Sequence, residues 1–269
     1  MRKQIATEKV MQVRKQLPRL GGRKLYHLLA KNFKAEHLRM GRDKLFDLLR
    51  EENLLVQKRK RYTKTTHSHH WMRTYPNLTE GLTATHPEHI WVAVITYLYA
   101  RKETCYLHLV TDAYSKQIMG YALSKDLAAA STVEALKMAL SKRKYQTSII
   151  HHSDRGLQYC SASYIGLLKK NNFLISMTQD GNPYDNAIAE RVNGILKQEF
   201  ELENTQTNLK QSRKQIHQAI ELYNNRRPHL SCHMLTPMQM HQQQTLKVKT
   251  WRKKISKSLG DLDIFCQHT

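Results

Sequence analysis

Apolar residues near the start of the chain follow the periodicity of amphipathic helices. They recur at three- and four-residue intervals in two stretches: Leu25, Leu28, Leu29 and Phe33, then Leu45, Leu48 and Leu49. This spacing places the apolar side chains on one face of a helix and the polar ones on the other. We therefore expect a small all-α, helix-turn-helix-like unit, with helices over residues 4–17, near 23–33 and from about residue 41.

From residue 90 onward, short runs rich in β-branched and aromatic residues predict strands. Residues 90–98 and 104–111 flank a polar turn and predict an antiparallel hairpin, and residues 117–123 predict a third strand. Helices and strands then alternate, with helices over 127–142, near 162–170, from about 185 and over 207–225, and strands over 148–151 and 173–176. This order predicts an α/β fold of the ribonuclease-H type, with a mixed five-stranded sheet and flanking helices.

The same pattern divides the chain into four segments. Residues 1–54 are expected to form a basic, helix-turn-helix-like DNA-binding region, and residues 55–88 a basic linker. Residues 89–243 are expected to form the ribonuclease-H-like core with a covering helix, and residues 244–269 a basic C-terminal tail. At 269 residues the chain is long enough to bury at least one substantial core.

The net charge of +22 predicts a polyanionic partner. Residues 1–66 carry 19 Lys and Arg against 6 Asp and Glu, so most of the excess lies in the first quarter of the chain. Charge alone fits a membrane surface, a nucleic acid or a solvated basic arm, and the helical pattern in the same stretch favours nucleic acid. The candidate DNA contacts in the helix from residue 41 and in the linker are Arg42, Lys44, Arg50, Lys58, Arg59, Lys60 and Arg61.

The cysteines and the hydropathy of the chain predict its compartment. The four cysteines form no CxxC pair and no stretch resembles a secretory signal, so we expect a reducing, cytoplasmic location. The sequence contains no run of 18 apolar residues, so we expect no membrane span.

Two acidic residues in the second part of the chain suggest a metal site. Asp154 follows the strand predicted over 148–151, and Glu190 lies on a later helix, with 35 residues between the two acids. On that helix Glu190 points away from the apolar stripe that begins at Ile188. Carboxylate oxygens suit Mg²⁺ or Mn²⁺, and a pair of such ions serves phosphodiester cleavage and transfer. The alternative for Glu190 is an ordinary solvated helix residue.

Several ordered runs extend the pattern around these two acids. They are WVAVITY at 91–97, YLHLVTDAYSK at 106–116, HSDRGLQY at 152–159, Ser176-Met177, GNPYDNA at 181–187, Glu190, Leu196-Lys197, Tyr223-Asn224 and Arg227-Pro228-His229. With these runs, residues 20–240 resemble the second-frame protein of bacterial insertion-sequence transposases of the IS-three family, whose core is similar to retroviral integrases. The resemblance covers about four fifths of the chain.

The resemblance implies a DNA transposase or integrase with three catalytic carboxylates and two bound metal ions, Mg²⁺ or Mn²⁺. Such an enzyme cuts double-stranded DNA at the ends of its element and joins the 3′ hydroxyl to another site. The resemblance also implies a bacterial, nucleoid-associated protein that works as a homo-oligomer, together with or fused to the protein of an upstream reading frame.

By position, Asp154 and Glu190 match the second and third acids of the family, and Val94 stands where the first belongs. The first Asp is expected to touch both metals, so Val94 removes the shared ligand and puts an apolar group beside two cations. We therefore expect weak metal binding and catalysis reduced by several powers of ten. Asp112 is not expected to substitute, because it lies roughly 13 Å along the neighbouring strand from the residue that pairs with Val94.

These residues leave three functions open. The first is a DNA transposase or integrase, impaired or inactive as written, whether Val94 reflects natural decay or a deliberate change. The second is a non-catalytic, sequence-specific DNA-binding protein or regulator derived from a transposase, and the third is a structure-selective nuclease. In each of them Arg155, Lys197 and Arg227 are further candidate phosphate contacts, with Lys197 on the same helix face as Glu190.

Overall fold

A computed structural model describes residues 2–57, 72–100, 103–179, 187–205 and 207–249 of the chain. The linker residues proposed as DNA contacts, Lys58, Arg59, Lys60 and Arg61, lie outside the described residues. So do most of the GNPYDNA run and most of the predicted basic tail.

Three helices form the N-terminal part: α1 (Arg2–Gln16), α2 (Gly22–Ala35) and α3 (Arg42–Glu51). Their predicted apolar faces meet in one cluster, in which Leu25, Phe33 and Leu45 are fully buried. The helix positions agree with the sequence pattern within a few residues, because the spacing of the leucines fixes one inner face for each helix.

A mixed sheet forms the second part of the chain. Its strands are β1 (Ile90–Ala100), β2 (Glu103–Asp112), β3 (Ile118–Ser124), β4 (Ile150–Ser153) and β5 (Leu174–Met177), in the spatial order β3-β2-β1-β4-β5. The first three strands pair antiparallel, and β4 and β5 continue the sheet in parallel with β1. A two-residue strand that was not predicted, β6 (Asn204–Thr205), pairs with the far end of β1.

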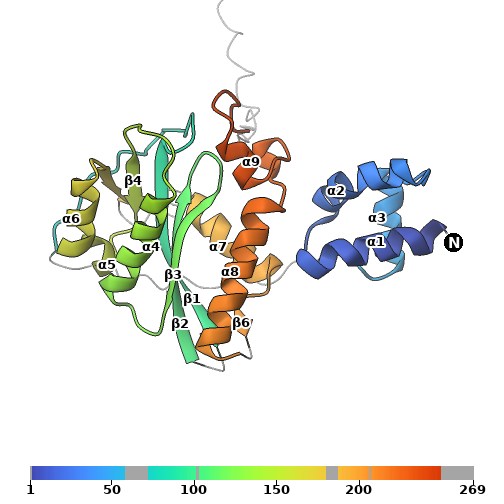
Figure 1. Ribbon diagram of the computed structural model, residues 1–269, viewed down its shortest axis with the longest axis horizontal. Coiled ribbons are helices and arrows are strands. Elements are labelled where there is room, and N and C mark those ends of the chain that lie inside the picture. Colours follow the sequence, from blue (N-terminus) through green and yellow to red (C-terminus); the bar gives the residue numbers. More distant parts are fainter. Residues whose placement is uncertain (1, 58–71, 101–102, 180–186, 206, 250–269) are drawn as a thin grey trace, which may run out of the picture.

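Helices cover both faces of the sheet (Figure 1). The remaining elements are α4 (Ala129–Ser141), α5 (Leu157–Cys160), α6 (Ala162–Lys170), α7 (Ala187–Glu199), α8 (Leu209–Asn225), a 3₁₀ turn η1 (Leu230–Cys232) and α9 (Pro237–His241). Alternate residues of β1 explain the two layers, because Trp91 and Ala93 pack in the cluster beneath α4 and α6, whereas Leu98 packs in the cluster beneath α7 and α8. The predicted ribonuclease-H-like integrase fold is thereby confirmed.

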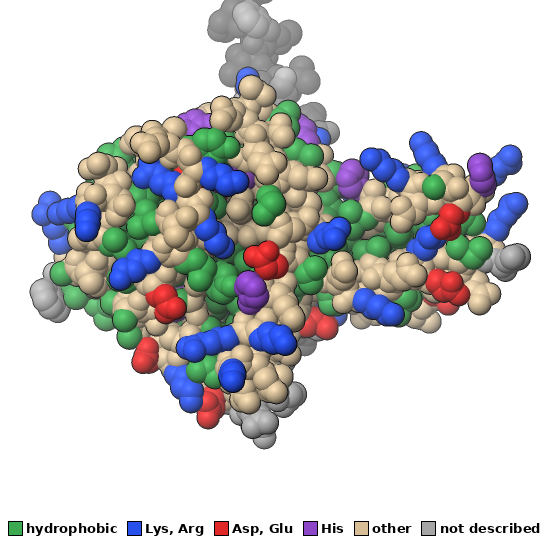
Figure 2. All heavy atoms as spheres, in the orientation of Figure 1, with side chains coloured by type: hydrophobic (Ala, Val, Ile, Leu, Met, Phe, Trp, Pro, Cys, Tyr) green, Lys and Arg blue, Asp and Glu red, His purple; other side chains and the backbone are tan. Residues whose placement is uncertain are grey.

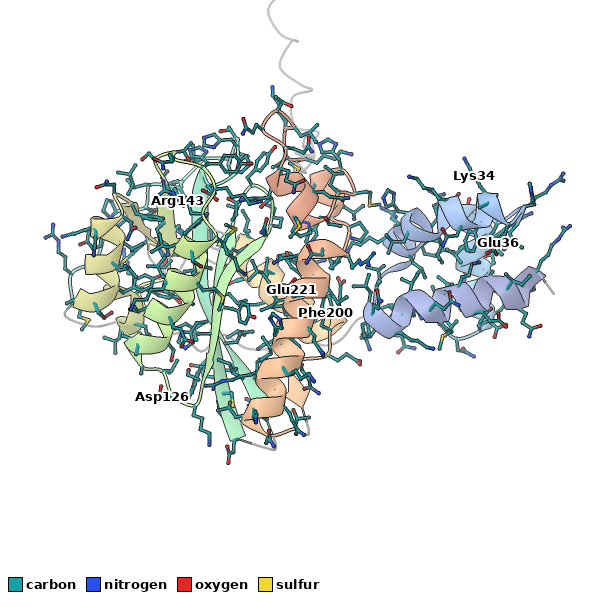
Figure 3. The ribbon with its side chains drawn as sticks, viewed as in Figure 1. Lys34, Glu36, Asp126, Arg143, Phe200 and Glu221 are labelled. Carbon is teal, nitrogen blue, oxygen red and sulfur yellow. The ribbon has the colours of Figure 1, made fainter. Side chains whose placement is uncertain are left out.

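The N-terminal helices dock beside the end of α7. Phe200, labelled in Figure 3, packs against both the cluster of α1–α3 and the cluster beneath α7 and α8. The backbone N–H of Arg19 donates to the Glu199 carbonyl at 3.3 Å, and Lys24 on α2 is 3.7 Å from the Glu199 carboxylate. Within the described ranges, no helix combines the length and apolarity that crossing a membrane requires.

Candidate active site and nucleic-acid interface

The parallel pair of β1 and β4 brings the predicted catalytic positions together. Val92 on β1 pairs with His152 on β4, and Asp154 directly follows the end of β4. Continuing this register past the end of β4 sets Val94 level with Asp154. Position 94 therefore lies on the strand next to the one that leads into Asp154, which fits the place that the resemblance gives it. Its assignment as the position of the missing first acid stays a prediction.

Asp154 lies in the turn between β4 and α5. Its Oδ1 accepts a hydrogen bond from the Gly156 N–H at 3.0 Å, and the side chain is half-buried. Burial raises the pKa of this carboxyl, and the Gly156 hydrogen bond offsets part of that rise. A nearby cation would favour the charged form, so the position suits a carboxylate that faces a positive ligand.

Glu190 lies in the first turn of α7 and is exposed. Its neighbour Ala189 and the following Val192 are buried, so Glu190 points away from the packed face as predicted. An acid near a helix N-terminus also interacts favourably with the helix dipole, and this is its alternative role. Its assignment as a catalytic acid stays a prediction.

Val94 is part of the packing between the sheet and α7. It pairs with Leu109 on β2, is partly buried, and packs against the two clusters that contain Ala189 and Val192. Over the described ranges, no three His, Cys, Asp or Glu side chains are grouped so that they would hold a metal ion. Two acids and a valine do not fit the three-carboxylate, two-metal arrangement that the resemblance implies.

Asp112 does not fill the gap. It pairs with Trp91 rather than with Val94, and it is completely buried. Its carboxylate accepts hydrogen bonds from the Glu88 N–H at 2.9 Å and from the N–H and hydroxyl of Ser115 at 2.8 and 2.5 Å. These bonds hold the turn between β2 and β3, so Asp112 is a structural acid.

The same acid belongs to a buried ionic cluster that the sequence did not reveal. His241 of α9 is 1% exposed, and its ring nitrogens lie 3.3 Å from Glu88 and 3.4 Å from Asp112. Burial lowers the pKa of His241, but the hydrogen bonds to Asp112 and Glu88 and their negative charges outweigh it and raise the pKa to about 9. The cluster ties α9 to the edge of the sheet.

This cluster predicts a pH-dependent stability. His241 stays protonated in the folded protein up to about pH 9 but in the unfolded chain only below about 6.5. Its contribution is therefore complete below pH 6.5 and is lost as the pH rises through 9. The free energy of unfolding of the unmodified protein should fall by on the order of 3 kcal/mol across this range. In the His241→Gln variant this fall should be largely absent. Urea denaturation measures it, with the exposed His27→Gln as the matched control.

The predicted DNA contacts on α3 are exposed but largely neutralised. Arg42 and Arg50 each pair at 2.8 Å with an acid of the same helix, Asp43 and Asp47 respectively. Lys44 is exposed as well. The helix carries three basic and three acidic residues, whereas α1 carries five against one and α2 four against none. The positive surface of this unit, seen at the right of Figure 2, therefore belongs mainly to α1 and α2.

Arg227, one of the predicted phosphate contacts, has a packing role in the structure, and its contact with DNA stays a prediction. Its side chain is 1% exposed, and its guanidinium donates to both carboxylate oxygens of Glu199 at 2.7 and 2.8 Å. A third nitrogen lies 2.8 Å from the His229 ring. An arginine enclosed by these partners stabilises the junction of α7 with the segment after α8. Phosphate contact was predicted from the charge of Arg227, because the sequence does not show which arginines are buried.

The other candidates remain open. Arg155 and Lys197 are both half-buried, and burial lowers the pKa of Lys197. Their contacts with phosphate stay predictions. His152, two residues before Asp154, is fully buried, with its Nδ1 2.8 Å from the Ser176 hydroxyl and 3.2 Å from that of Thr79. These contacts link β4 to β5 and to the segment before β1, so His152 has a packing role.

Comparison with known proteins agrees with this architecture. A family model described as an integrase core domain matches residues 84–183, and a second model of the same description matches residues 171–237. A cryoEM structure of the simian T-cell lymphotropic virus intasome with PP2A regulatory subunit B56 gamma aligns with a TM-score of 0.53 and 18% identity, over 85% of this chain and 80% of that one. This likeness shows the fold.

Two curated relatives show the family. An insertion element IS600 31 kDa protein of Shigella sonnei is 34% identical over 77% of this chain and 75% of its own length. The transposase InsF of insertion sequence IS3fB of Escherichia coli K12 is 34% identical over 72% of this chain and 68% of its own length. For the InsF of IS3A, the alignment covers 53% of its length at 36% identity. The chain therefore belongs to the IS3 family of bacterial insertion-sequence transposases.

Proposed function

We propose that this transposase-family chain binds double-stranded DNA but cleaves and transfers strands poorly or not at all. The single observation that carries the proposal is the valine at position 94, on the strand that pairs with β4, which leads into Asp154. The surrounding fold is that of an integrase core, and the N-terminal helices α1 and α2 carry a large positive excess. The protein thus keeps the features needed to hold DNA and lacks one acid of the catalytic set.

The missing acid also affects the binding of metal ions. Intact members with three carboxylates are expected to use Mg²⁺ or Mn²⁺, because carboxylate oxygens suit these ions. Here Asp154 and Glu190 would offer oxygen ligands, but the apolar Val94 offers none. We therefore expect this chain to bind such ions weakly at the catalytic position, although it is similar to a protein named a transposase.

The second candidate function is that of a regulator. A chain that occupies the ends of an element without cutting them would block intact transposase at the same sites. The valine at position 94 together with the basic helices α1 and α2 favours this role. The viral neighbour is described within an intasome. We propose by analogy that this chain forms homo-oligomers on DNA in the bacterial nucleoid, and associates with the protein of its upstream frame.

Binding of DNA without metal tests this proposal. We expect a labelled double-stranded end fragment to be bound in EDTA, with an affinity that falls steeply with salt, because phosphate contacts release counterions. Fluorescence anisotropy between 50 and 200 mM salt should show roughly a thousandfold loss if six or more phosphates are contacted. Absence of binding at low salt would rule out both candidate functions.

A further inference from the structure

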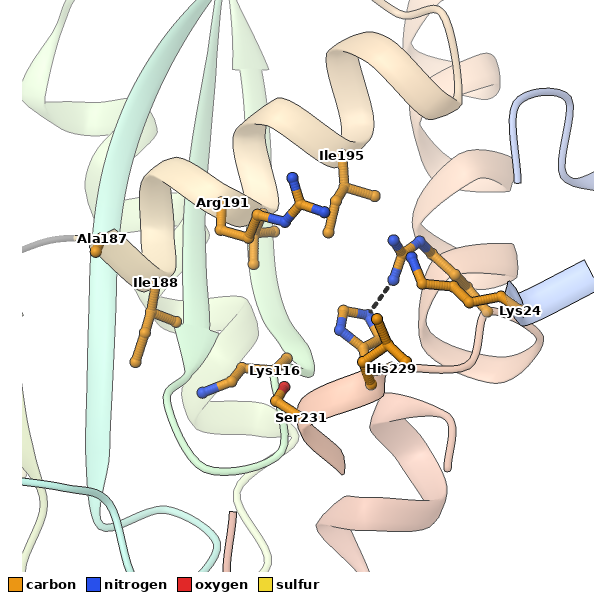
Figure 4. A pocket seen from close by; sticks show the side chains of 11 residues that line it. Lys24, Lys116, Ala187, Ile188, Arg191, Ile195, His229 and Ser231 are labelled. Carbon is orange, nitrogen blue, oxygen red and sulfur yellow. Dashed lines mark hydrogen bonds between the residues drawn. The ribbon is translucent and has the colours of Figure 1, made fainter. Parts of the chain in front are cut away.

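A cavity of about 310 Å³ opens where the N-terminal helices meet the core, and nothing in the catalytic arrangement accounts for it. Figure 4 shows side chains from several elements around it: Lys24 from α2, Lys116 from the β2–β3 turn, Arg191 from α7 and His229 after α8. Its volume falls at the small end of ligand pockets. The cavity is thus built by segments far apart in the sequence.

The walls of this cavity carry an excess of positive charge. Lys24, Lys116, Arg191 and Arg227 line it, and the described lining residues include no acid. Glu199 lies close by, but Arg227 already binds both of its carboxylate oxygens. The lining therefore holds more cations than nearby anions, an arrangement that favours an anionic ligand.

The pKa values of the lining groups reflect the same excess of positive charge. Burial and the charge of Arg227 lower the pKa of Lys24 to about 8, although Glu199 lies 3.7 Å away. Burial also lowers the pKa of His229 far below its usual value, and Arg227, Lys24, Lys116 and Arg191 all lower it further. His229 is therefore neutral, and the four cations are close enough to act on one ring. An anion would relieve this repulsion.

Arg191 is the cation best placed to bind such an anion. It is exposed at the cavity, and within the described ranges it makes no hydrogen bond or ion pair with another residue. Lys116, by contrast, donates to the Ala113 carbonyl. Arg191 acts on the Glu199 carboxylate only through its charge. A guanidinium that makes no hydrogen bond to the described residues and faces a cavity rich in cations has its donors available for phosphate oxygens.

Neighbouring hollows share lining residues with the cavity on both sides. The cavity shares Lys116, Ile188 and Ser231 with a cleft that reaches His152 and Thr79 beside the sheet edge. On the other side it shares Lys24 and Arg191 with a hollow bounded by Arg19 and Arg23 before and within α2. The hollow on the α2 side adds Arg19 and Arg23 beside Glu199, and the cleft beside the sheet adds Lys249 and the acid Glu80. A chain of phosphates would therefore meet most of its cations between the cavity and α2, an extended charge that a single free anion would not need.

We propose that this cavity holds a backbone phosphate of the bound DNA, gripped by Lys24 and Arg191 where the strand passes from the N-terminal helices to the sheet edge. The inference rests on the proposed DNA-binding function and assigns a site to it. The ligand is a phosphodiester group of DNA, and free inorganic phosphate is the alternative source of the same chemistry.

The test compares two charge-matched double variants in the full chain. Lys24→Gln/Arg191→Gln removes the cavity cations, and Lys169→Gln/Lys170→Gln removes two exposed cations from α6, across the sheet from the cavity. We expect the cavity variant to bind end DNA roughly tenfold more weakly and to lower the salt slope by about 1. The α6 variant should bind like the unmodified protein.

A second measurement does not depend on how the double variant folds. Because the pKa of Lys24 is about 8, its charge and its grip on phosphate fade as the pH rises from 7 to 9. DNA affinity of the unmodified protein should therefore fall over this range more than that of Lys24→Gln alone. Arg191→Gln, an exposed substitution, should by itself reduce the salt slope.

The possible outcomes distinguish a failure of the proposed cavity site from a failure of the proposed DNA-binding function. If the unmodified protein binds DNA but the salt slopes of both double variants equal its own, the cavity site is wrong and the function stands. If inorganic phosphate raises the melting temperature of the unmodified protein but not of the cavity variant, while DNA binding is equal in both, the ligand is a free anion and the proposal is overturned. If the unmodified protein does not bind DNA, the proposed function itself fails.

Discussion

A Val94→Asp variant will join element-end DNA to a target in Mg²⁺ or Mn²⁺, whereas the unmodified chain will leave the same DNA unjoined. The reason lies in the register of β1 and β4, which pairs Val92 with His152 and, carried past the end of β4, sets residue 94 level with Asp154. An aspartate there would complete a set of three carboxylates with Asp154 and Glu190. The gain should amount to several powers of ten in rate, since loss of a shared metal ligand disables such sites.

Matched variants make this prediction specific. Val94→Asn has nearly the shape of the aspartate without its charge, and it should remain inactive. Val94→Asp combined with Glu190→Gln should lose the restored activity. Because Val94 is partly buried among apolar residues, the aspartate should lower the melting temperature without metal, and added Mg²⁺ should recover part of the loss. Equal joining by the unmodified chain and Val94→Asp would show that residue 94 is not the missing ligand.

The second large effect concerns stability at the domain junction. Arg227→Met should lower the free energy of unfolding by about 3–5 kcal/mol, because it leaves the Glu199 carboxylate largely enclosed and without its bidentate partner. Lys24 is 3.7 Å from the same carboxylate and compensates only in part. Urea denaturation measures the change.

An exposed ion pair supplies the control for this variant. Lys125 and Glu103 are 3.7 Å apart and both more than half exposed, so Lys125→Met should change stability by less than about 1 kcal/mol. Adding Glu199→Leu to Arg227→Met should restore much of the lost stability, since the stranded acid is then removed. A loss below about 1 kcal/mol for Arg227→Met alone would contradict the structural role given to this arginine.

Local patterns predicted the elements that build the site. The leucine spacing of α2 and α3 and the alternation along β1 depend only on nearby residues, so the helices and strands were found within a few positions. The strand that delivers Asp154 was expected over 148–151 and lies at Ile150–Ser153. Its end was displaced because the buried run continues through the polar His152 and Ser153.

These local patterns do not predict which residues distant in the sequence will pair. Arg227 meets Glu199, and Asp112 meets His241, only after the chain has folded, so neither pair leaves a local signature. The same holds for the cavity cations Lys24 and Arg191, which come from separate parts of the chain. Position 94 was identified by its place in a matching run, and the pairing of β1 with β4 then supplied its spatial neighbour.

The central claim is that this chain holds DNA without processing it. One measurement addresses it most directly: the unmodified protein is incubated with end-labelled element DNA and Mg²⁺ or Mn²⁺, and each sample is resolved on native and denaturing gels. We expect a retarded complex on the native gel and a full-length, unjoined strand on the denaturing gel. A nicked or joined strand formed at the rate of the Val94→Asp variant would contradict the central claim.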